Sequence, residues 1–174
     1  MKSCITLIGM PGAGKSVIGK SLAIRLGVEF VDTDLLIEAT HNAPLQNILN
    51  ERGYLALRQL EEEQILSMAP TDQVIATGGS AVYSDKAMLH LKESSTLIFL
   101  DIDLDTVRQR IHNFDQRGIA RAPGQSIEMI FHERYALYQQ YADIQLLSAG
   151  NSPEKIVSDI LESIAGLQHC AEKT

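Results

Sequence analysis

The chain has 174 residues, of which 45% are hydrophobic and 21% are charged, and this composition predicts one folded domain with a sizeable core. The formal net charge of −7 at pH 7 disfavours general binding to phosphate backbones, so we expect no nucleic-acid partner. The N-terminal apolar run is too short for a membrane span and lacks the pattern of a signal peptide, so we expect a cytoplasmic protein without membrane contact.

Apolar runs of strand length alternate along the chain with segments of helical periodicity. In chain order, the predicted elements are a strand over 4–8, a helix over 15–26, a strand over 29–31, a helical stretch over 34–49 broken near Pro44, a helix over 54–68, a strand over 74–76, a helix over 86–91, a strand over 97–100, a helix over 104–112, a mobile loop over 112–126, a helix over 127–141, a strand over 144–147 and a helix beginning at Pro153. This alternation predicts an α/β fold with a parallel sheet covered by helices.

The segment Gly9-Met-Pro-Gly-Ala-Gly-Lys15-Ser16 matches the pattern G-x-x-x-x-G-K-S/T in full and lies between a predicted strand and a predicted helix. Glycines allow the backbone to turn tightly and to direct its N–H groups inward, and the following helix adds the positive end of its dipole. Lys15 can reach the β- and γ-phosphates, and the Ser16 hydroxyl can hold Mg²⁺. The motif predicts binding of a nucleoside triphosphate and leaves the reaction open.

Two carboxylates follow the second predicted strand. If this segment is extended, alternation places Asp32 and Asp34 on one face. One could support the magnesium shell, and the other could accept a hydroxyl proton or hydrogen bond. Asp101, at the end of the apolar run 97–101, is a second candidate for the magnesium aspartate, and the pattern does not choose between Asp32 and Asp101.

Arg58 and Glu61 are three residues apart in a predicted helix and therefore share a face. An arginine held by its own glutamate would be oriented to grip a carboxylate. The Gly78-Gly79 pair follows a predicted strand, where the backbone can approach a ligand closely.

Taken together, these residues resemble the shikimate kinase family over about residues 5–164. The order of motifs is that of the family: the phosphate loop, Asp32-Thr-Asp34, Arg58-x-x-Glu61, Gly78-Gly79, an arginine-bearing lid, Arg134-x-x-Leu-Tyr138 and Ala142-Asp143. The resemblance implies a three-layer P-loop kinase fold over 1–174, with a five-stranded parallel sheet, a lid over 112–126 and an acceptor-binding helical segment over 34–61. It also implies that ATP, with Mg²⁺, phosphorylates shikimate to shikimate 3-phosphate in aromatic amino-acid biosynthesis.

The resemblance further implies a role for each matching residue. The nucleotide would be bound by Gly12, Ala13, Gly14, Lys15, Ser16, Val17, Arg110 and Arg117, and the acceptor by Asp34, Arg58, Gly78, Gly79 and Arg134. Ser16 and Asp32 would serve Mg²⁺, which favours Asp32 over Asp101. Lys15, Asp34 and Arg117 would be the catalytic side chains. Arg121 is an alternative lid arginine, but the spacing from Arg110 favours Arg117.

The sequence departs from the family pattern in the lid and the acceptor pocket. Gly118 stands where the lid usually has proline, and we expect it to loosen that position. Ser80 replaces a third glycine, and Leu57 replaces an aromatic residue that often packs on the acceptor ring. These changes leave the acceptor as shikimate or another small carboxylated polyol or hydroxy acid.

Three other classes are weaker hypotheses. A regulatory GTPase-like module would carry an Asn-Lys-x-Asp guanine motif, which the sequence lacks. A kinase-like protein without catalysis conflicts with the number of retained site residues, and a nucleoside monophosphate kinase is a further enzymatic rival. We expect a monomer whose partner is a small-molecule acceptor.

Overall fold

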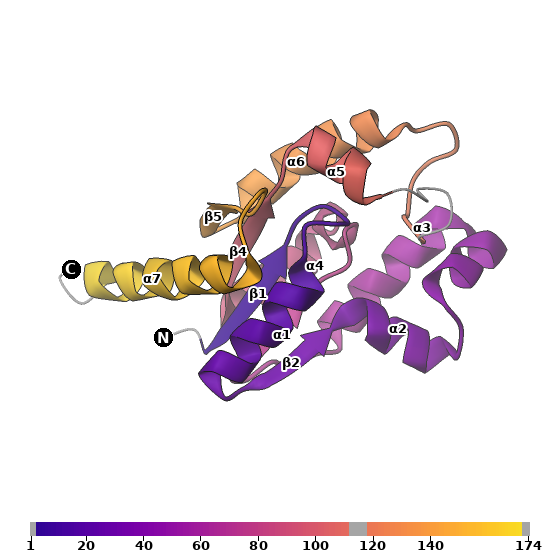
Figure 1. Ribbon diagram of the computed structural model, residues 1–174. Coiled ribbons are helices and arrows are strands. Elements are labelled where there is room, and N and C mark those ends of the chain that lie inside the picture. Colours follow the sequence, from indigo (N-terminus) through magenta and orange to yellow (C-terminus); the bar gives the residue numbers. More distant parts are fainter. Residues whose placement is uncertain (1–2, 112–117, 172–174) are drawn as a thin grey trace.

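A five-stranded sheet forms the centre of the molecule. The computed structural model describes residues 3–111 and 118–171 (Figure 1). The strands are β1 (Cys4–Ile8), β2 (Glu29–Asp32), β3 (Gln73–Ala76), β4 (Ser95–Asp101) and β5 (Ile144–Leu147). They are ordered β2-β3-β1-β4-β5, and every neighbouring pair is parallel. The predicted five-stranded parallel α/β sheet is therefore confirmed.

Helices cover both faces of this sheet, which gives three layers. They are α1 (Lys15–Leu26), α2 (Thr33–His41), α3 (Leu45–Leu66), α4 (Asp85–Ser94), α5 (Leu104–Arg110), α6 (Ile127–Tyr141) and α7 (Pro153–Ala171). Helix α1 packs against α7 on one face, whereas α3 packs on α4 and α6 packs on β4 on the other (Figure 1). Among the described residues, we find no helix with both the length and the apolar content needed to cross a membrane.

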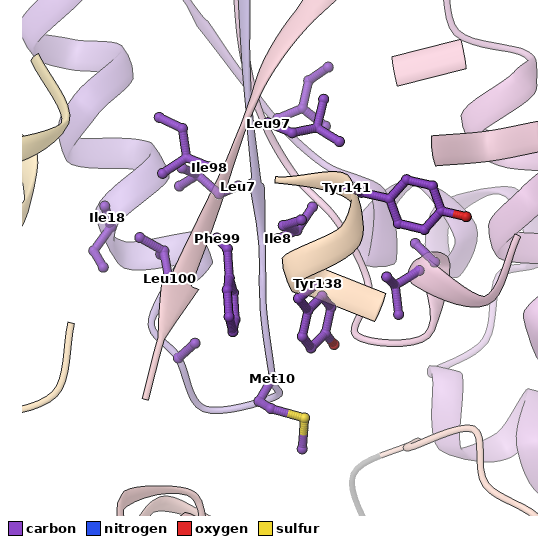
Figure 2. Packing of buried hydrophobic residues seen from close by; sticks show 14 of the residues in the cluster. Leu7, Ile8, Met10, Ile18, Leu97, Ile98, Phe99, Leu100, Tyr138 and Tyr141 are labelled. Carbon is purple, nitrogen blue, oxygen red and sulfur yellow. The ribbon is translucent and has the colours of Figure 1, made fainter. Parts of the chain in front are cut away.

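The main core lies on both sides of the two central strands. All five residues of β1 are buried, as are the apolar residues 97–100 of β4, which explains why both strands read as continuous apolar runs. Figure 2 shows Ile18 of α1 on one side of these strands and Tyr138 of α6 on the other. The Tyr138 ring stacks on Phe99, with 5.1 Å between the ring centroids, and this packing fixes α6 against the sheet.

The connection after β2 differs from the prediction of an extended Asp32–Asp34 segment. Asp32 ends the strand and caps α2, because its Oδ1 accepts a hydrogen bond of 3.1 Å from the backbone N–H of Asp34. Asp34 therefore lies in the first turn of a helix. The prediction that alternation along a strand brings the two carboxylates together is wrong, and a helix cap places them instead.

Other predicted boundaries shift modestly. The stretch predicted over 34–49 divides into α2 and the start of α3, and α3 continues through the region predicted as a separate helix, with a kink at Gly53. A short 3₁₀ turn, η1 (Ala81–Tyr83), follows β3 and has no counterpart among the predicted elements. Helix α5 ends at Arg110, before the predicted limit of 112. Of the loop predicted over 112–126, residues 112–117 lie outside the described part, and 118–126 contain neither helix nor strand.

Candidate active site

A pocket of about 360 Å³ opens where β1, β2 and β3 end. Ligands of open α/β sheets bind at this carboxyl edge of the strands. The lining comes from Pro11, Gly12, Gly14, Lys15, Ser16, Val17, Asp32, Asp34, Leu45, Glu61, Thr77, Gly79, Ser80, Gly118, Ile119, Ala120 and Arg134. The pocket therefore joins the phosphate loop to residues from α2, α3, α6 and the 118–120 segment.

The phosphate loop forms one half of this pocket. Gly12 and Gly14 both have positive φ angles, 84° and 92°, which side chains rarely adopt. Gly14 also precedes the first residue of α1, so the free N–H groups of that helix start face the pocket. Ala13 is buried beneath the loop and does not line the pocket, whereas Val17 does.

Lys15 and Ser16 meet β2 at the base of the loop. The Lys15 ammonium donates hydrogen bonds to the carbonyl oxygens of Gly9 and Met10, at 2.7 and 3.1 Å. Burial lowers the pKa of Lys15 to about 8, although the nearby Asp34 and Asp32 favour its charged form. Because those bonds are made to the loop itself, a phosphate placed in the loop would offer the ammonium a stronger, charged partner.

Ser16 and Asp32 are suited to magnesium. The Ser16 hydroxyl donates to Asp32 Oδ2 at 2.7 Å, so two oxygen ligands lie together beside the loop. Among residues 3–111 and 118–171, no three His, Cys, Asp or Glu side chains are placed to hold a metal ion. Mg²⁺ bound here would take its remaining ligands from phosphate and water, which is its usual behaviour.

Asp101, the competing aspartate, has a different environment. Its Oδ2 accepts hydrogen bonds from the Tyr135 hydroxyl at 3.0 Å and from Gln145 Nε2 at 2.8 Å. It does not line the pocket. The structure therefore brings Asp32, and not Asp101, to the phosphate loop.

The carboxyl groups of Asp34 and Glu61 line the pocket. Asp34 Oδ1 is buried and has no hydrogen-bond partner. Burial, together with Asp32, raises the pKa of Asp34 to about 6, and burial together with Asp34 raises the pKa of Glu61 to about 7. Asp34, whose Oδ1 is unpartnered and whose pKa is about 6, is suited to accept a hydroxyl proton at neutral pH.

Two arginines converge on the Ala120 carbonyl, and one of them, Arg134, lines the pocket. Arg134 is 1% exposed, and its guanidinium donates to the Ala120 carbonyl at 2.8 Å. Arg58 donates to the same carbonyl at 3.4 Å, while its Nε is buried without a hydrogen-bond partner. Two guanidinium groups that converge on one oxygen can bind a carboxylate.

The Arg58–Glu61 pair expected from their spacing is not formed. Glu61 instead accepts a hydrogen bond from the Ser80 hydroxyl, and no ion pair joins it to Arg58 among the described residues. The guanidinium of Arg58 lies over the ring of Tyr83, with 3.5 Å from Cζ to the ring centroid. The prediction of an arginine held by its own glutamate is therefore wrong. Glu61 is hydrogen-bonded to the hydroxyl of Ser80 instead, and Arg58 stacks on the ring of Tyr83.

The two glycines after β3 allow charged groups to approach the backbone. A Cβ at Gly78 would collide with Glu61 Oε1 and lie 2.5 Å from Asp34 Oδ1. A Cβ at Gly79 would lie 2.9 Å from Arg134 Nη1. Gly79 lines the pocket and Gly78 supports it from behind, so both positions require the smallest residue.

The lid segment is held more tightly at its glycine than the sequence predicts. Gly118 has a φ angle of 60°, and its N–H donates to Gln46 Oε1 at 2.6 Å. A Cβ there would lie 2.8 Å from the Cβ of Leu45. Proline has no N–H and cannot adopt positive φ, so it does not fit this position. The expectation that Gly118 loosens the lid is wrong.

None of the remaining predicted residues that the structure describes lines the pocket. Arg110 donates to the Gly12 carbonyl at 2.9 Å and so contacts the phosphate loop without lining the pocket. Arg117 lies outside the described residues. Arg121 donates to the Gln125 carbonyl and lines a separate hollow beside α3, not the phosphate pocket. Leu57 is buried with Ala120 in a small core, so its side chain supports the pocket from outside.

Sequence reasoning misses the contributions of Ser80, Tyr83 and Ala120. In the sequence, Ser80 stands out only as a change from glycine, and its bond to Glu61 depends on two segments 19 residues apart. Tyr83 lies in a short turn that no periodicity indicates. Ala120 acts through its backbone carbonyl oxygen, a group that every residue type has, so the sequence does not point to it.

Together, the fold and this site define a P-loop phosphotransferase for a small anionic acceptor. The family model "Shikimate kinase" matches residues 11–165. A shikimate kinase of Persephonella marina is 37% identical over 161 residues, which cover 92% of this chain and 98% of that protein. The chain therefore belongs to the shikimate kinase family.

Solved structures agree with this assignment. A shikimate kinase of Acinetobacter baumannii in complex with shikimate matches with a TM-score of 0.87 and 26% identity, over 94% of this chain and 93% of that one. A shikimate kinase of Aquifex aeolicus matches with a TM-score of 0.83 and 29% identity, over 95% and 98% of the two chains. The family uses ATP as its phosphate donor.

Proposed function

We propose that this protein transfers the γ-phosphoryl group of ATP to the 3-hydroxyl of shikimate, giving shikimate 3-phosphate and ADP. The observation that carries the proposal is that a single pocket joins the phosphate loop, Asp34 and Arg134, while Arg58 donates to the same Ala120 carbonyl as Arg134. In this pocket, Oδ1 of Asp34 is buried and has no hydrogen-bond partner. A regulatory nucleotide-binding module would not need the arginine side of this pocket. The same arrangement favours a catalytic protein over a kinase-like protein without activity.

In this proposal, the phosphate half holds and neutralises the donor. The N–H groups of residues 12–17 and the Lys15 ammonium bind the phosphates, and Arg110 supports the loop from the nucleotide side. Ser16 and Asp32 hold Mg²⁺, which supplies charge neutralisation for the transferring phosphoryl group when it is bound. Arg117, which lies outside the described residues, is proposed as a further catalytic cation for the transferring phosphoryl group.

The acceptor half orients shikimate and takes its proton. Arg58 and Arg134 bind the carboxylate, with Gly78 and Gly79 allowing the close approach that the pocket needs. Asp34 accepts the proton of the attacking hydroxyl, because it is buried, unpartnered and ionised above about pH 6. Residues 118–120 close the pocket on one side and limit access of water, which would otherwise compete for the phosphoryl group.

The proposal also covers the oligomeric state, the cellular location and the partners of the protein. The protein acts as a monomer in the cytoplasm, without nucleic-acid or membrane partners, and its partner is the small-molecule acceptor. The net charge of −7 supports the exclusion of nucleic acid. Size-exclusion chromatography with light scattering tests the monomer.

The proposal is tested by identifying the product. Purified protein is incubated with ATP, Mg²⁺ and shikimate, and the phosphate ester is located by ³¹P–¹H correlation NMR. We expect an ester on the 3-hydroxyl and a stoichiometric yield of ADP. A panel of other carboxylated polyols and small hydroxy acids runs in parallel, and an ester formed on one of these but not on shikimate would overturn the assignment of the acceptor.

A further inference from the structure

Tyr83 lies between the two helices that carry the acceptor arginines. It ends η1, the turn that follows the Gly78-Gly79 pair, and η1 packs against both α3 and α6. Arg58 projects from α3 and Arg134 from α6. One side chain from a third element is therefore placed to act on both arginines.

The ring of Tyr83 contacts both guanidinium groups. Cζ of Arg58 lies 3.5 Å from the ring centroid, and Cζ of Arg134 lies 5.3 Å from it. Both distances are within the range in which a cation is attracted by the electrons of an aromatic face. The Tyr83 hydroxyl also accepts a hydrogen bond of 3.4 Å from Arg134 Nε.

These contacts matter because the two arginines have no carboxylate partner within the described part of the chain. Among the described residues, neither Arg58 nor Arg134 forms an ion pair within 4.0 Å, and the nearby Glu61 is bonded to Ser80. Two like charges that converge on the Ala120 carbonyl repel each other. An aromatic face offsets part of that repulsion and orders the guanidinium groups.

The ring contact also leaves hydrogen-bond donors available. A guanidinium that stacks on a ring uses its face, whereas a carboxylate is bound by the N–H groups at its edge. Arg58 Nε is buried and has no hydrogen-bond partner, which is the state expected of a donor kept for a ligand. A glutamate partner would instead occupy this edge and compete with the acceptor.

We propose that Tyr83 is a positioning residue for the acceptor carboxylate, since its ring contacts the guanidinium groups of Arg58 and Arg134 while Arg58 Nε stays free to donate to a ligand. The proposal rests on the proposed function, because it assumes a carboxylated acceptor in this pocket. It predicts that Tyr83 governs acceptor affinity and has no part in binding ATP.

Kinetics with two variants separate the ring from the hydroxyl. Tyr83→Leu removes the ring, and we expect a rise of about 10-fold in the KM for shikimate, with kcat and the KM for ATP within about twofold of wild type. Tyr83→Phe keeps the ring, and we expect a change in the KM for shikimate of no more than about threefold. Tyr135→Leu removes another half-buried ring, one that packs on Phe99, and serves as the matched control with an unchanged KM.

A second readout needs no acceptor. In wild-type protein, the Nε–Hε NMR signal of Arg58 should carry the ring-current shift of Tyr83 and show restricted side-chain motion. Tyr83→Leu should reduce the shift to the smaller contribution of the Tyr54 ring, which lies 5.2 Å from Arg58 Cζ, and should increase the motion. Tyr83→Phe should retain the wild-type shift and the restricted motion. Thermal unfolding of all three variants checks that the fold is intact.

The kinetic and NMR readouts distinguish failure of the proposed function from failure of the positioning role. If wild-type protein phosphorylates no shikimate but the arginine signals depend on the ring, the proposed function fails and the positioning role of Tyr83 is supported. Arginine signals that are unchanged in Tyr83→Leu would overturn the positioning role. An active Tyr83→Leu enzyme with a wild-type KM for shikimate would overturn it as well.

Discussion

The two halves of the pocket are built in different ways. The phosphate half comes from one continuous segment, residues 9–17, and the donors that we propose for the phosphates are largely backbone N–H groups, placed by glycines and by the start of a helix. The acceptor half is assembled from side chains on α2, α3, η1 and α6, together with the carbonyl of Ala120. A site made of backbone N–H groups is specified by a local sequence motif, whereas a site made of side chains from distant elements depends on how those elements pack.

This difference predicts that changes in the two halves should affect different kinetic constants. Changes in the phosphate half should remove transfer to any acceptor, because they act on the donor. Changes in the acceptor half should act on the affinity and choice of acceptor and leave the donor site intact.

Lys15→Ala should have the largest effect. Its ammonium is the buried cation of the phosphate half, and we expect kcat to fall by about 1,000-fold or more through lost stabilisation of phosphoryl transfer. The measurement is ADP release under saturating shikimate. Near-normal turnover would show that the loop does not act on the transferring group.

Arg58→Ala should affect the acceptor selectively. Removing one of the two guanidinium groups should lower kcat/KM for shikimate by a factor that corresponds to about 3 kcal/mol, while the affinity for ATP stays close to that of wild type. Nucleotide titration and acceptor kinetics on the same preparation measure both. If ATP affinity alone changed, the division of the pocket into two halves would be incorrect.

Glu61→Gln should change how stability depends on pH. Burial raises the pKa of Glu61 above its value in the unfolded chain, so its contribution to stability is full below about pH 4.5 and is lost as pH rises through about 7. Glutamine is neutral throughout and can still accept from Ser80. We expect the free energy of unfolding at pH 8 to rise by on the order of 2 kcal/mol relative to wild type.

Denaturant unfolding of both proteins from pH 4.5 to 8 measures this effect. The difference between the two proteins should grow with pH. A difference that is independent of pH would mean that the Glu61 carboxyl ionises as easily in the folded as in the unfolded protein.

Gly118→Pro should give the smallest of these effects. Proline, the family's usual residue, would remove the hydrogen bond to Gln46 and conflict with the φ angle of 60°. We expect a loss of about 1–2 kcal/mol in the free energy of unfolding. The control Gln46→Ala removes only the hydrogen bond and should cost about half as much, so a neutral or stabilising Gly118→Pro would contradict the observed contact.

The sequence predicts the sheet and the phosphate half well. Buried parallel strands appear as continuous apolar runs, and the loop motif specifies its own backbone geometry. The family resemblance also names the acceptor residues Asp34, Arg58, Gly79 and Arg134 that the structure brings together. Their order along the chain carries that information.

The partners of those acceptor residues could not be predicted. The hydrogen bond of Glu61 to Ser80 and the stacking of Arg58 on Tyr83 join segments 19 and 25 positions apart, and no local pattern encodes them. The structure of Gly118 depends on Leu45 and Gln46, some 70 residues earlier. Departures from a family pattern are therefore interpretable only with the tertiary contacts around them.

The most direct test of a divided pocket is the initial rate of ADP release with ATP and Mg²⁺, measured with and without shikimate. If both halves belong to one catalytic site, shikimate should raise the rate by at least about 100-fold, because transfer to water is suppressed without a bound acceptor. A rate of ADP release that is unchanged by shikimate, in protein shown to bind ATP, would contradict the assignment of the arginine half to this acceptor.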